Sequence, residues 1–325
     1  MVARRAVLIA LALAGLFALG GRGFGQEFPT GPITFVVSFP PGGSIDVVMR
    51  AMAPKLQERL GKPVVIENRA GAGGNIAAAA VANAPPDGHT LLAPASSLAA
   101  NPTLVKNMPF DTLKDLQAIA LLFRTPLVLV VNPSVPAKSV SELIALLKQK
   151  PGEISFGHSG AGAAIFLAAE LLQSMTGTKM NGVAYRGAPP ALNVMAGHVA
   201  LMFADAGSVV GHINAGRVRA LGVSSTARVP ALPNVPTIAE SGVPGFDAVG
   251  WTMICAPAAT PKPVIDRLHA ELKAVAATPE VRDVSVRIGT IPVDSPPPTE
   301  LQKFLASEID RWGSLIQRAG PAKTE

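Results

Sequence analysis

The 325-residue sequence predicts an α/β protein with mostly parallel sheets, organised as two domains. Apolar, β-branched segments alternate with segments of helical periodicity along most of the chain, which is the order of elements in this fold class. A strand, a glycine-rich turn and a helix follow one another twice, first near residue 40 and again near residue 160. The length also suits two domains of roughly 100–200 residues each.

The N-terminal segment has the features of a secretory signal peptide. A pair of arginines precedes an apolar segment over residues 6–19, and small residues flank Phe24 ahead of a cleavage site. The apolar segment is too short to remain as a membrane span. We therefore expect residues 1–25 to be removed and the mature protein to reside in a bacterial periplasm, by either the Sec or the Tat route.

Charge and cysteine content argue against several function classes. The chain has 28 basic and 22 acidic residues, but three of its arginines lie in the signal segment, which leaves a net charge of +3 instead of +6. No run of Lys and Arg indicates a nucleic-acid partner. The single cysteine, Cys255, cannot form an internal disulfide, and the five histidines lack the spacing of zinc ligands. We expect no cofactor and no metal.

The first organising stretch runs from Ile33 to Arg50. Residues 33–38 are apolar and mostly β-branched, as in a strand that a parallel sheet buries on both faces. From Ile45 to about Leu60 apolar residues recur at helical spacing, and Pro54 is expected to bend this helix or mark its weak point. The glycine turn between strand and helix leaves backbone N–H groups at the positive end of the helix dipole.

Two interpretations of this turn, Pro41 to Asp46, are compatible. In the structural one, its glycines permit positive φ, Ser44 caps the helix and Asp46 favours the first helical turn. In the functional one, the free N–H groups bind an anion, which we expect to be the carboxylate of a small ligand. The two stiffening prolines and two glycines favour anion binding.

The remaining elements continue the alternation of strands and helices. Apolar runs bounded by Pro, Gly and Asn predict strands, and periodic segments predict helices, one of them opened by a capping box from Ser139 to Glu142. The expected strands are 63–67, 89–93, 126–131, 153–156, 183–185, 199–203, 218–224 and 251–256. The expected helices are 76–83, the one beginning at 139, 163–173 and, closing the chain, 263–276 and about 299–318.

The second glycine turn, residues 157–162, admits three interpretations. It is a plain tight turn, or a second anion cradle that faces the first across a cleft, or a nucleophile elbow with Ser159 in a sequence close to G-x-S-x-G. Asp205 and either His212 or His269 follow in the order of a hydrolase triad. No oxyanion-hole segment precedes the turn, so a secreted serine hydrolase is the alternative function and not the favoured one.

A third turn, from Tyr185 to Ala191, contains the only tyrosine of the chain. Its Arg186 is a solvated loop charge in the ordinary case. Close to the other two turns, Arg186 would instead supply a cation for a carboxylate.

Ordered matches over the mature chain resemble the Bug family of periplasmic solute-binding proteins, the receptors of tripartite tricarboxylate transporters. The matching segments are 39–46 (FPPGGSID), 67–75 (ENRAGAGGN), 86–92 (PDGHTLL), 185–188 (YRGA), 219–221 (RAL), 232–242 (LPNVPTIAESG), Trp251 and 256–257 (AP).

The resemblance implies a type II periplasmic-binding-protein fold, with two α/β lobes and a ligand cleft between them. Lobe 1 would comprise residues 26–125 and 250–325, and lobe 2 residues 126–249. The implied function is to bind a small organic carboxylate (a dicarboxylate, a tricarboxylate or an aromatic acid) for delivery to membrane transporter subunits, as a monomer and without catalysis. A sensory receptor that presents its ligand to a membrane kinase is a further alternative.

The resemblance also implies that backbone N–H groups and bridging waters of the two strand–helix turns hold the ligand carboxylate. This chain has His158 where the family commonly has serine, Ala163 for a small polar residue and Phe166 for histidine, so we expect a less polar pocket suited to an aromatic or more apolar acid. The expected ligand-binding residues are Phe39, Gly42, Gly43, Ser44, Asp46, His158, Ser159, Gly160, Ala161, Gly162, Ala163, Tyr185, Arg186, Gly187, Ala188 and Asp205.

Overall fold

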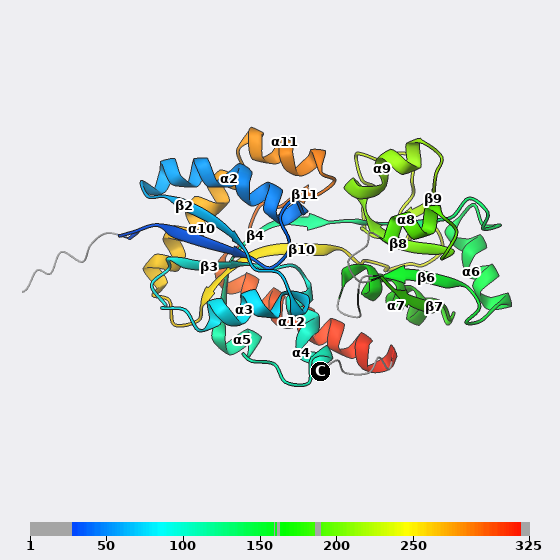
Figure 1. Ribbon diagram of the computed structural model, residues 1–325, viewed down its shortest axis with the longest axis horizontal. Coiled ribbons are helices and arrows are strands. Elements are labelled where there is room, and N and C mark those ends of the chain that lie inside the picture. The colour runs from blue at the N-terminus through cyan, green and yellow to red at the C-terminus, as the bar shows by residue number, and fades with distance from the viewer. Residues whose placement is uncertain (1–27, 159, 161–162, 186–189, 320–325) are drawn as a thin grey trace, which may run out of the picture.

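The computed structural model describes residues 28–158, 160, 163–185 and 190–319. Two sheets, each flanked by helices, form two lobes side by side, which confirms the predicted two-lobed α/β fold (Figure 1). The expected signal peptide, residues 1–25, lies outside the described residues. No helix of the described part of the chain is long and apolar enough to cross a membrane.

Lobe 1 contains a six-stranded sheet with the order β11-β4-β10-β3-β1-β2. Helices α2, α10 and α11 cover one face of the sheet, and α3, α4 and α12 cover the other. The strands are β1 (Ile33–Val37), β2 (Val64–Asn68), β3 (Thr90–Ala93), β4 (Leu116–Thr125), β10 (Gly250–Pro257) and β11 (Ile291–Pro292). The helices are α2 (Ser44–Leu60), η1 (Ala72–Gly74), α3 (Asn75–Ala82), α4 (Ser97–Leu104), α5 (Thr112–Asp115), α10 (Lys262–Ala276), α11 (Pro279–Arg287) and α12 (Pro298–Ala319).

Lobe 2 contains a five-stranded sheet with the order β7-β6-β8-β5-β9. Its strands are β5 (Leu127–Val131), β6 (Ser155–His158), β7 (Asn181–Ala184), β8 (Leu201–Asp205) and β9 (Arg219–Val223). Its helices are α6 (Val140–Gln149), α7 (Ala164–Thr176), α8 (Pro190–Met195) and α9 (Ala206–Asn214).

The expectation of mostly parallel sheets is wrong. Only β1 with its neighbours β2 and β3, and β6 with its neighbours β7 and β8, are parallel among the described strand pairs. Strands β4, β10, β11 and β5 pair antiparallel with their neighbours. The reason is topological, because β4, β5 and β10 carry the chain from one lobe to the other and back.

The two chain crossovers lie side by side. Strand β4 ends at Thr125 in lobe 1, β5 starts two residues later in lobe 2, and the returning strand β10 begins at Gly250, which pairs with Thr125. The fully buried Ser224 ties the crossovers together: its Oγ accepts the Leu127 N–H at 2.9 Å, and its carbonyl accepts the Ala248 N–H at 3.0 Å. This junction is the hinge region of the molecule.

The C-terminal helix α12 contacts both lobes. It packs on α4 and β4 in lobe 1 and on α7 in lobe 2 (Figure 1). The buried carboxylate of Glu308 on α12 accepts hydrogen bonds from the indole nitrogens of Trp251, at 2.8 Å, and of Trp312, at 2.9 Å. Since Trp251 belongs to β10, the helix is anchored to a strand that enters the hinge.

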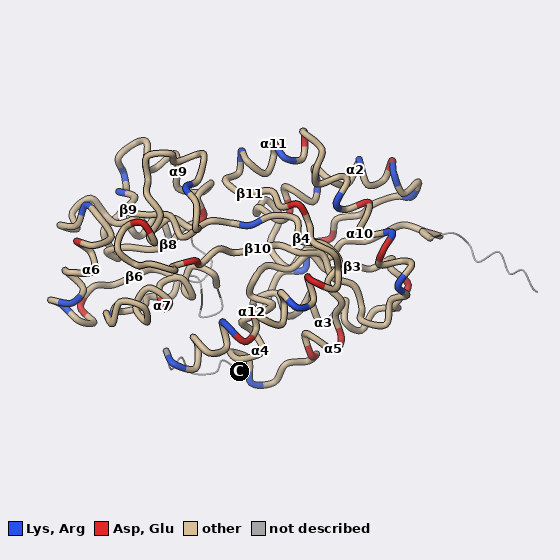
Figure 2. The backbone as a smooth tube through the Cα atoms, turned by 180° about the vertical axis from the view of Figure 1, so that it is seen from behind, with Lys and Arg blue, Asp and Glu red and all other residues tan. Residues whose placement is uncertain are grey.

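Local expectations hold with specific differences. The Ser139 half of the capping box is confirmed, because the Glu142 N–H donates to Ser139 Oγ at 3.2 Å, whereas the Glu142 carboxylate accepts the Lys138 N–H at 2.7 Å in place of the Ser139 N–H. Helix α2 continues through Pro54. The closing region was predicted as two helices, but α11 and β11 lie between α10 and α12. Basic and acidic residues are interspersed over both lobes (Figure 2).

Candidate functional site

Strand register places the two glycine turns at edges that face the hinge. In lobe 1, β1 runs parallel to β3, and β10 runs antiparallel from Gly250 at the hinge, so the carboxyl end of β1 points toward the hinge. In lobe 2, Leu127 at the start of β5 pairs with Asp205 at the end of β8, and β6 is parallel to β8. The turns after β1 and β6 therefore both start beside the crossover, one in each lobe.

The first turn is held by the side chain of Asp46. Its carboxylate accepts the Gly42 N–H at 2.9 Å and the Arg50 Nε at 2.9 Å. Burial of Asp46 opposes ionisation, but these hydrogen bonds outweigh it and keep the pKa of the carboxyl below its ordinary value. The charge of Asp46 is thus neutralised inside the protein, so this side chain shapes the turn.

Two supporting residues were missed from the sequence. Arg50 lies one helical turn after Asp46 and also donates to Asn68 Oδ1 at 3.0 Å, while Asn68 Nδ2 donates to the carbonyl of Phe39 at 3.1 Å. The acid–base pair at positions i and i+4 of a helix is a signal that could have revealed Arg50. Asn68 is the last residue of the neighbouring parallel strand β2, at the sheet edge where the carboxyl ends of the parallel strands lie.

The exposed part of the first turn consists of backbone donors. Gly42 has φ of +84°, which favours glycine, and Gly43 is the N-cap of α2 without a side-chain cap. Both glycines are exposed and Ser44 is half-buried. Among the described residues, no acceptor contacts the N–H groups of Ser44 and Ile45. The turn therefore presents unpaired amides at the positive end of a 17-residue helix.

The second turn starts later than expected. His158 belongs to β6, where it pairs with Ala184, so the predicted end of this strand at Phe156 is wrong. Gly157, which was expected in the turn, is likewise a residue of β6, and it pairs with Val183 of β7 and Met202 of β8. Gly160 then takes φ of +136°, and Ala163 is the N-cap of α7 without a side-chain cap. As in the first turn, no described acceptor contacts the first N–H groups of the helix, those of residues 164 and 165.

His158 contributes a neutral ring and not a cation. Its side chain is 8% exposed and packs against Phe156 and Phe166, with ring centroids 5.4 and 4.8 Å away. Burial lowers the pKa of the imidazole. Nδ1 accepts the Gly160 N–H at 3.2 Å, so a neutral ring carries its proton on Nε2. The imidazole thus helps to hold the second turn through its hydrogen bond with the Gly160 N–H.

The third turn begins beside the second. The Tyr185 N–H donates to the carbonyl of His158 at 2.8 Å, and the tyrosine side chain is half-buried. Six of the expected ligand-binding residues fall outside the described residues: Arg186, Gly187, Ala188, Ala161, Gly162 and Ser159, the last of which is also the candidate nucleophile.

Asp205 ends β8 at the same sheet edge and is the N-cap residue that precedes α9. Its side chain is in contact with solvent, and no donor among the described residues contacts its carboxylate. The protein around it nevertheless raises the pKa of the carboxyl, because it removes part of the bulk water that would stabilise the charge.

The described residues do not assemble the triad of a hydrolase. Asp205 precedes α9 and His212 lies in its last turn, about 10 Å along the helix axis at 1.5 Å per residue. His269 is on α10 in lobe 1, and its Nδ1 contacts the carbonyl of Ile119 at 2.8 Å. Neither histidine can therefore form a pair with Asp205 beside the second turn.

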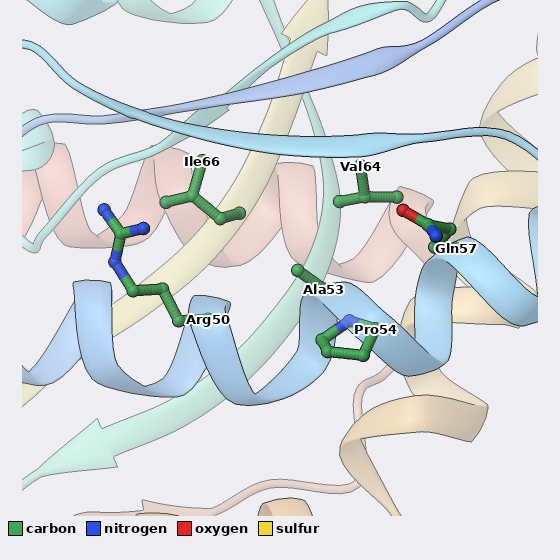
Figure 3. A pocket seen from close by; sticks show the side chains of 6 residues that line it. All are labelled: Arg50, Ala53, Pro54, Gln57, Val64 and Ile66. Atoms are coloured by element: carbon green, nitrogen blue, oxygen red, sulfur yellow. The ribbon is translucent and has the colours of Figure 1, made fainter.

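A surface hollow of about 370 Å³ lies between α2 and the edge strand β2 (Figure 3). It is lined by Arg50, Ala53, Pro54, Gln57, Val64 and Ile66. The only charged group in this lining is Arg50, which is already paired with Asp46 and Asn68. The hollow therefore offers a ligand no unpaired charged group, whereas the turns offer unpaired backbone amides, and we place the candidate site at the turns.

Two α/β lobes, a double crossover and amide-presenting turns on both sides define the class of bilobal solute-binding proteins. The chain belongs to one family of that class, the tripartite tricarboxylate transporter family receptors, whose family model matches residues 48–320. This confirms the family resemblance seen in the sequence.

Relatives and solved structures agree with the assignment. Protein BugT of Bordetella pertussis is 38% identical over 298 residues, which cover 91% of each chain. The structure of R. palustris Rpa4515 with adipate has a TM-score of 0.80 and 34% identity, and covers 91% of this chain and 99% of its own. MatC from Rhodopseudomonas palustris with bound malate has a TM-score of 0.76 and 31% identity, and covers 89% and 100%.

Proposed function

We propose that this protein binds a small organic carboxylate between its lobes in the periplasm and delivers it, as a monomer, to the membrane subunits of a tripartite transporter. One observation carries the proposal. The strand–glycine turn–helix units of the two lobes both end beside the crossover, and each presents helix N-terminal amides that have no acceptor among the described residues. Such amides bind anions.

The proposed mechanism is capture without chemistry. Each turn alone offers a partial positive charge to a carboxylate, and closure of the lobes brings both turns to one ligand. Closure also removes bulk water, which strengthens every charge–dipole interaction in the site. Because the amides are fixed by helices, little reorganisation is needed on binding. The lobes in this proposal are residues 26–125 with 250–325, and residues 126–249.

The residues take different roles in this proposal. The backbone of Gly42 to Ser44 and of residues 159–163 contacts the carboxylate, and residues 185–188 border it. Asp46 and His158 position the turns, since their polar atoms are engaged within the protein. Asp205 is the acceptor of the site and would take a hydroxyl or N–H group of the ligand.

The proposed class of ligand follows from the aromatic side chains that adjoin the second turn. Phe156, His158 and Phe166 form one aromatic cluster without a charged group, and this cluster joins the second turn where His158 Nδ1 accepts the Gly160 N–H. The R. palustris neighbours were solved with adipate and malate, which are small dicarboxylates. An aromatic cluster suits the more apolar end of this range, so we propose adipate-like or aromatic acids ahead of citrate.

A ligand panel tests the function. Protein purified without refolding would be titrated calorimetrically with adipate, malate, citrate and benzoate, after a thermal-shift screen of the same acids. We expect saturable binding of at least one acid, with adipate or benzoate raising Tm more than citrate does. Absence of binding by every carboxylate would refute the receptor function, and a larger shift with citrate would refute the proposed ligand preference.

A further inference from the structure

The lobes touch through two glycines. Gly207 lies in the first turn of α9 in lobe 2, and Gly289 follows α11 in lobe 1. A Cβ atom added at Gly207 would lie 2.1 Å from the carbonyl oxygen of Ile288 and 2.7 Å from its carbonyl carbon. A Cβ atom added at Gly289 would lie 2.5 Å from the nitrogen of Gly207 and 2.9 Å from its Cα. The two backbones are therefore in direct contact, with no side chain between them.

This contact lies immediately beside the hinge. The N–H of Ala206, the residue before Gly207, donates to the carbonyl of Pro126 at the first crossover, at 3.3 Å. Two residues after Gly289, Ile291 pairs with Arg124 on the hinge strand β4. Figure 1 shows α9 and α11 next to each other on the same side of the molecule, one from each lobe. The contact thus joins the lobes close to the axis about which they would move.

The backbone conformation does not explain the glycine at position 207. It lies inside a helix and is not among the residues with positive φ, so an alanine there would favour the helix itself. Gly211 occupies the same helix, and a Cβ added there would have nothing within 4 Å. The distinguishing property of Gly207 is therefore the backbone of the other lobe pressed against it.

The opposing group cannot move aside easily. It is the main chain at the end of α11, where the Ile288 N–H donates to Val284 at 3.2 Å and the Thr290 N–H donates to Ser285 at 3.0 Å. Gly207 itself is exposed, but Gly289 and Thr290 of the opposing main chain are buried, so this main chain has little free space into which it could recede. An added methyl group at Gly207 therefore has to separate the lobes, and a small separation near the axis turns one lobe relative to the other.

We propose that Gly207 and Gly289 are positioning residues that set how closely the lobes approach, and so allow both amide turns to reach one carboxylate. This inference rests on the proposed function and adds how the binding geometry is fixed. Gly207 is two residues from Asp205, so a displacement of α9 also moves the acceptor of the site. Removing the glycine contact should weaken ligand binding without touching any ligand atom.

The test compares Gly207→Ala with Gly211→Ala, the same substitution in the same helix. Adipate and malate affinities would be measured by calorimetry, and the radius of gyration by small-angle X-ray scattering with and without each acid. We expect Gly207→Ala to lose about tenfold or more in affinity and to scatter as a more open molecule. Gly211→Ala should match the wild type in both measurements. Equal affinity and equal scattering of the two variants would overturn the inference.

Two further readouts separate this inference from the receptor function. If the wild type binds neither acid, the proposed function fails, and the ligand-free scattering of the two variants still decides whether the glycine contact sets the lobe separation. If Gly207→Ala fails to fold, amide hydrogen exchange of the wild-type protein serves as the test in place of that variant. Adipate should then slow exchange of the amides at 207 and 289 more than at 211, and no difference between them would overturn the inference.

Discussion

The substitution Gly43→Val tests the first turn with little effect on the fold. Gly43 is the N-cap of α2 with φ of −73° and ψ of 167°, a conformation open to any L-residue. A Cβ atom there would lie 3.6 Å from the Pro40 carbonyl oxygen, an ordinary contact. Valine is a poorer N-cap than glycine, so we expect a loss of about 1 kcal/mol in the free energy of unfolding, or about 2–4 °C in Tm.

The effect on binding should be much larger. A valine side chain at this exposed position occupies the space through which a carboxylate approaches the Ser44 and Ile45 amides. A hydrogen bond to a charged group contributes about 1.5–3 kcal/mol, so the loss of one such bond lowers affinity by about 10- to 150-fold. Displacement from both amides would abolish measurable binding.

The assay is calorimetric titration of wild type and variant with the acid that binds the wild type most tightly. Gly31→Val is the matched control, because Gly31 precedes the opposite end of β1, and a Cβ atom added there would lie 4.0 Å from its nearest neighbour, His89 Cδ2. Circular dichroism and Tm would confirm that both variants fold. Wild-type affinity in Gly43→Val would remove the first turn from the site and refute the dipole argument.

Three further predictions concern the hinge and the cleft. Ser224→Ala should lower the free energy of unfolding by about 1–3 kcal/mol in urea denaturation, because it leaves a buried backbone N–H at the crossover unpaired. Glu308→Leu should cost about 2–4 kcal/mol in the same assay, because the indole N–H groups of Trp251 and Trp312 lose their acceptor. The folded-state pKa of Asp205 is raised, so its contribution to stability is present below its ordinary pKa and is lost as pH rises through the raised value. Asp205→Asn should therefore be more stable than the wild type at about pH 7 but not at about pH 4.

Exposed residues of the same types provide the controls. Ser307→Ala and Glu300→Leu change side chains on the solvent side of α12 and should shift stability by no more than about 0.5 kcal/mol. Loss of stability in these controls equal to that in the buried variants would contradict the hinge assignments. An Asp205→Asn variant whose stability followed pH as the wild type does would contradict the raised pKa.

The sequence predicted the elements that carry their own local signals. Strand β1, the amphipathic α2 and the capping box at Ser139 depend on neighbouring residues, and their predicted positions agree with the structure within a few residues. Strand β4 was missed, because its continuous apolar run from Leu116 lacks the alternation of a half-buried strand, and periodicity alone does not distinguish such a run from a buried helix segment. Its antiparallel pairing with β10 joins segments more than a hundred residues apart, which no local pattern encodes.

For the candidate site, the glycine turns were found because positive φ and helix starts leave traces in the sequence. The roles of individual side chains were not predictable from those traces. Asp46 was expected to contact the ligand, but its placement depends on Arg50 and on the fold of the turn. The contact between Gly207 and Gly289 had no signal in the sequence, since Gly207 occupies an ordinary helical position and Gly289, with φ of +77°, is explained locally as the glycine that follows a helix end.

The charges of the described turn residues explain why closure and binding are coupled in this proposal. Asp46 is neutralised by Arg50, and His158 is held neutral by burial, so these groups offer a carboxylate no net positive charge. The attraction therefore comes from partial charges on fixed amides, which are weak in water and several-fold stronger where water is excluded. Either open lobe alone would hold the anion poorly, whereas two helix ends facing one carboxylate in a dry cleft hold it well. A receptor built this way also releases its ligand when the lobes part, since the amides of the described turn residues form no salt bridge that has to be broken.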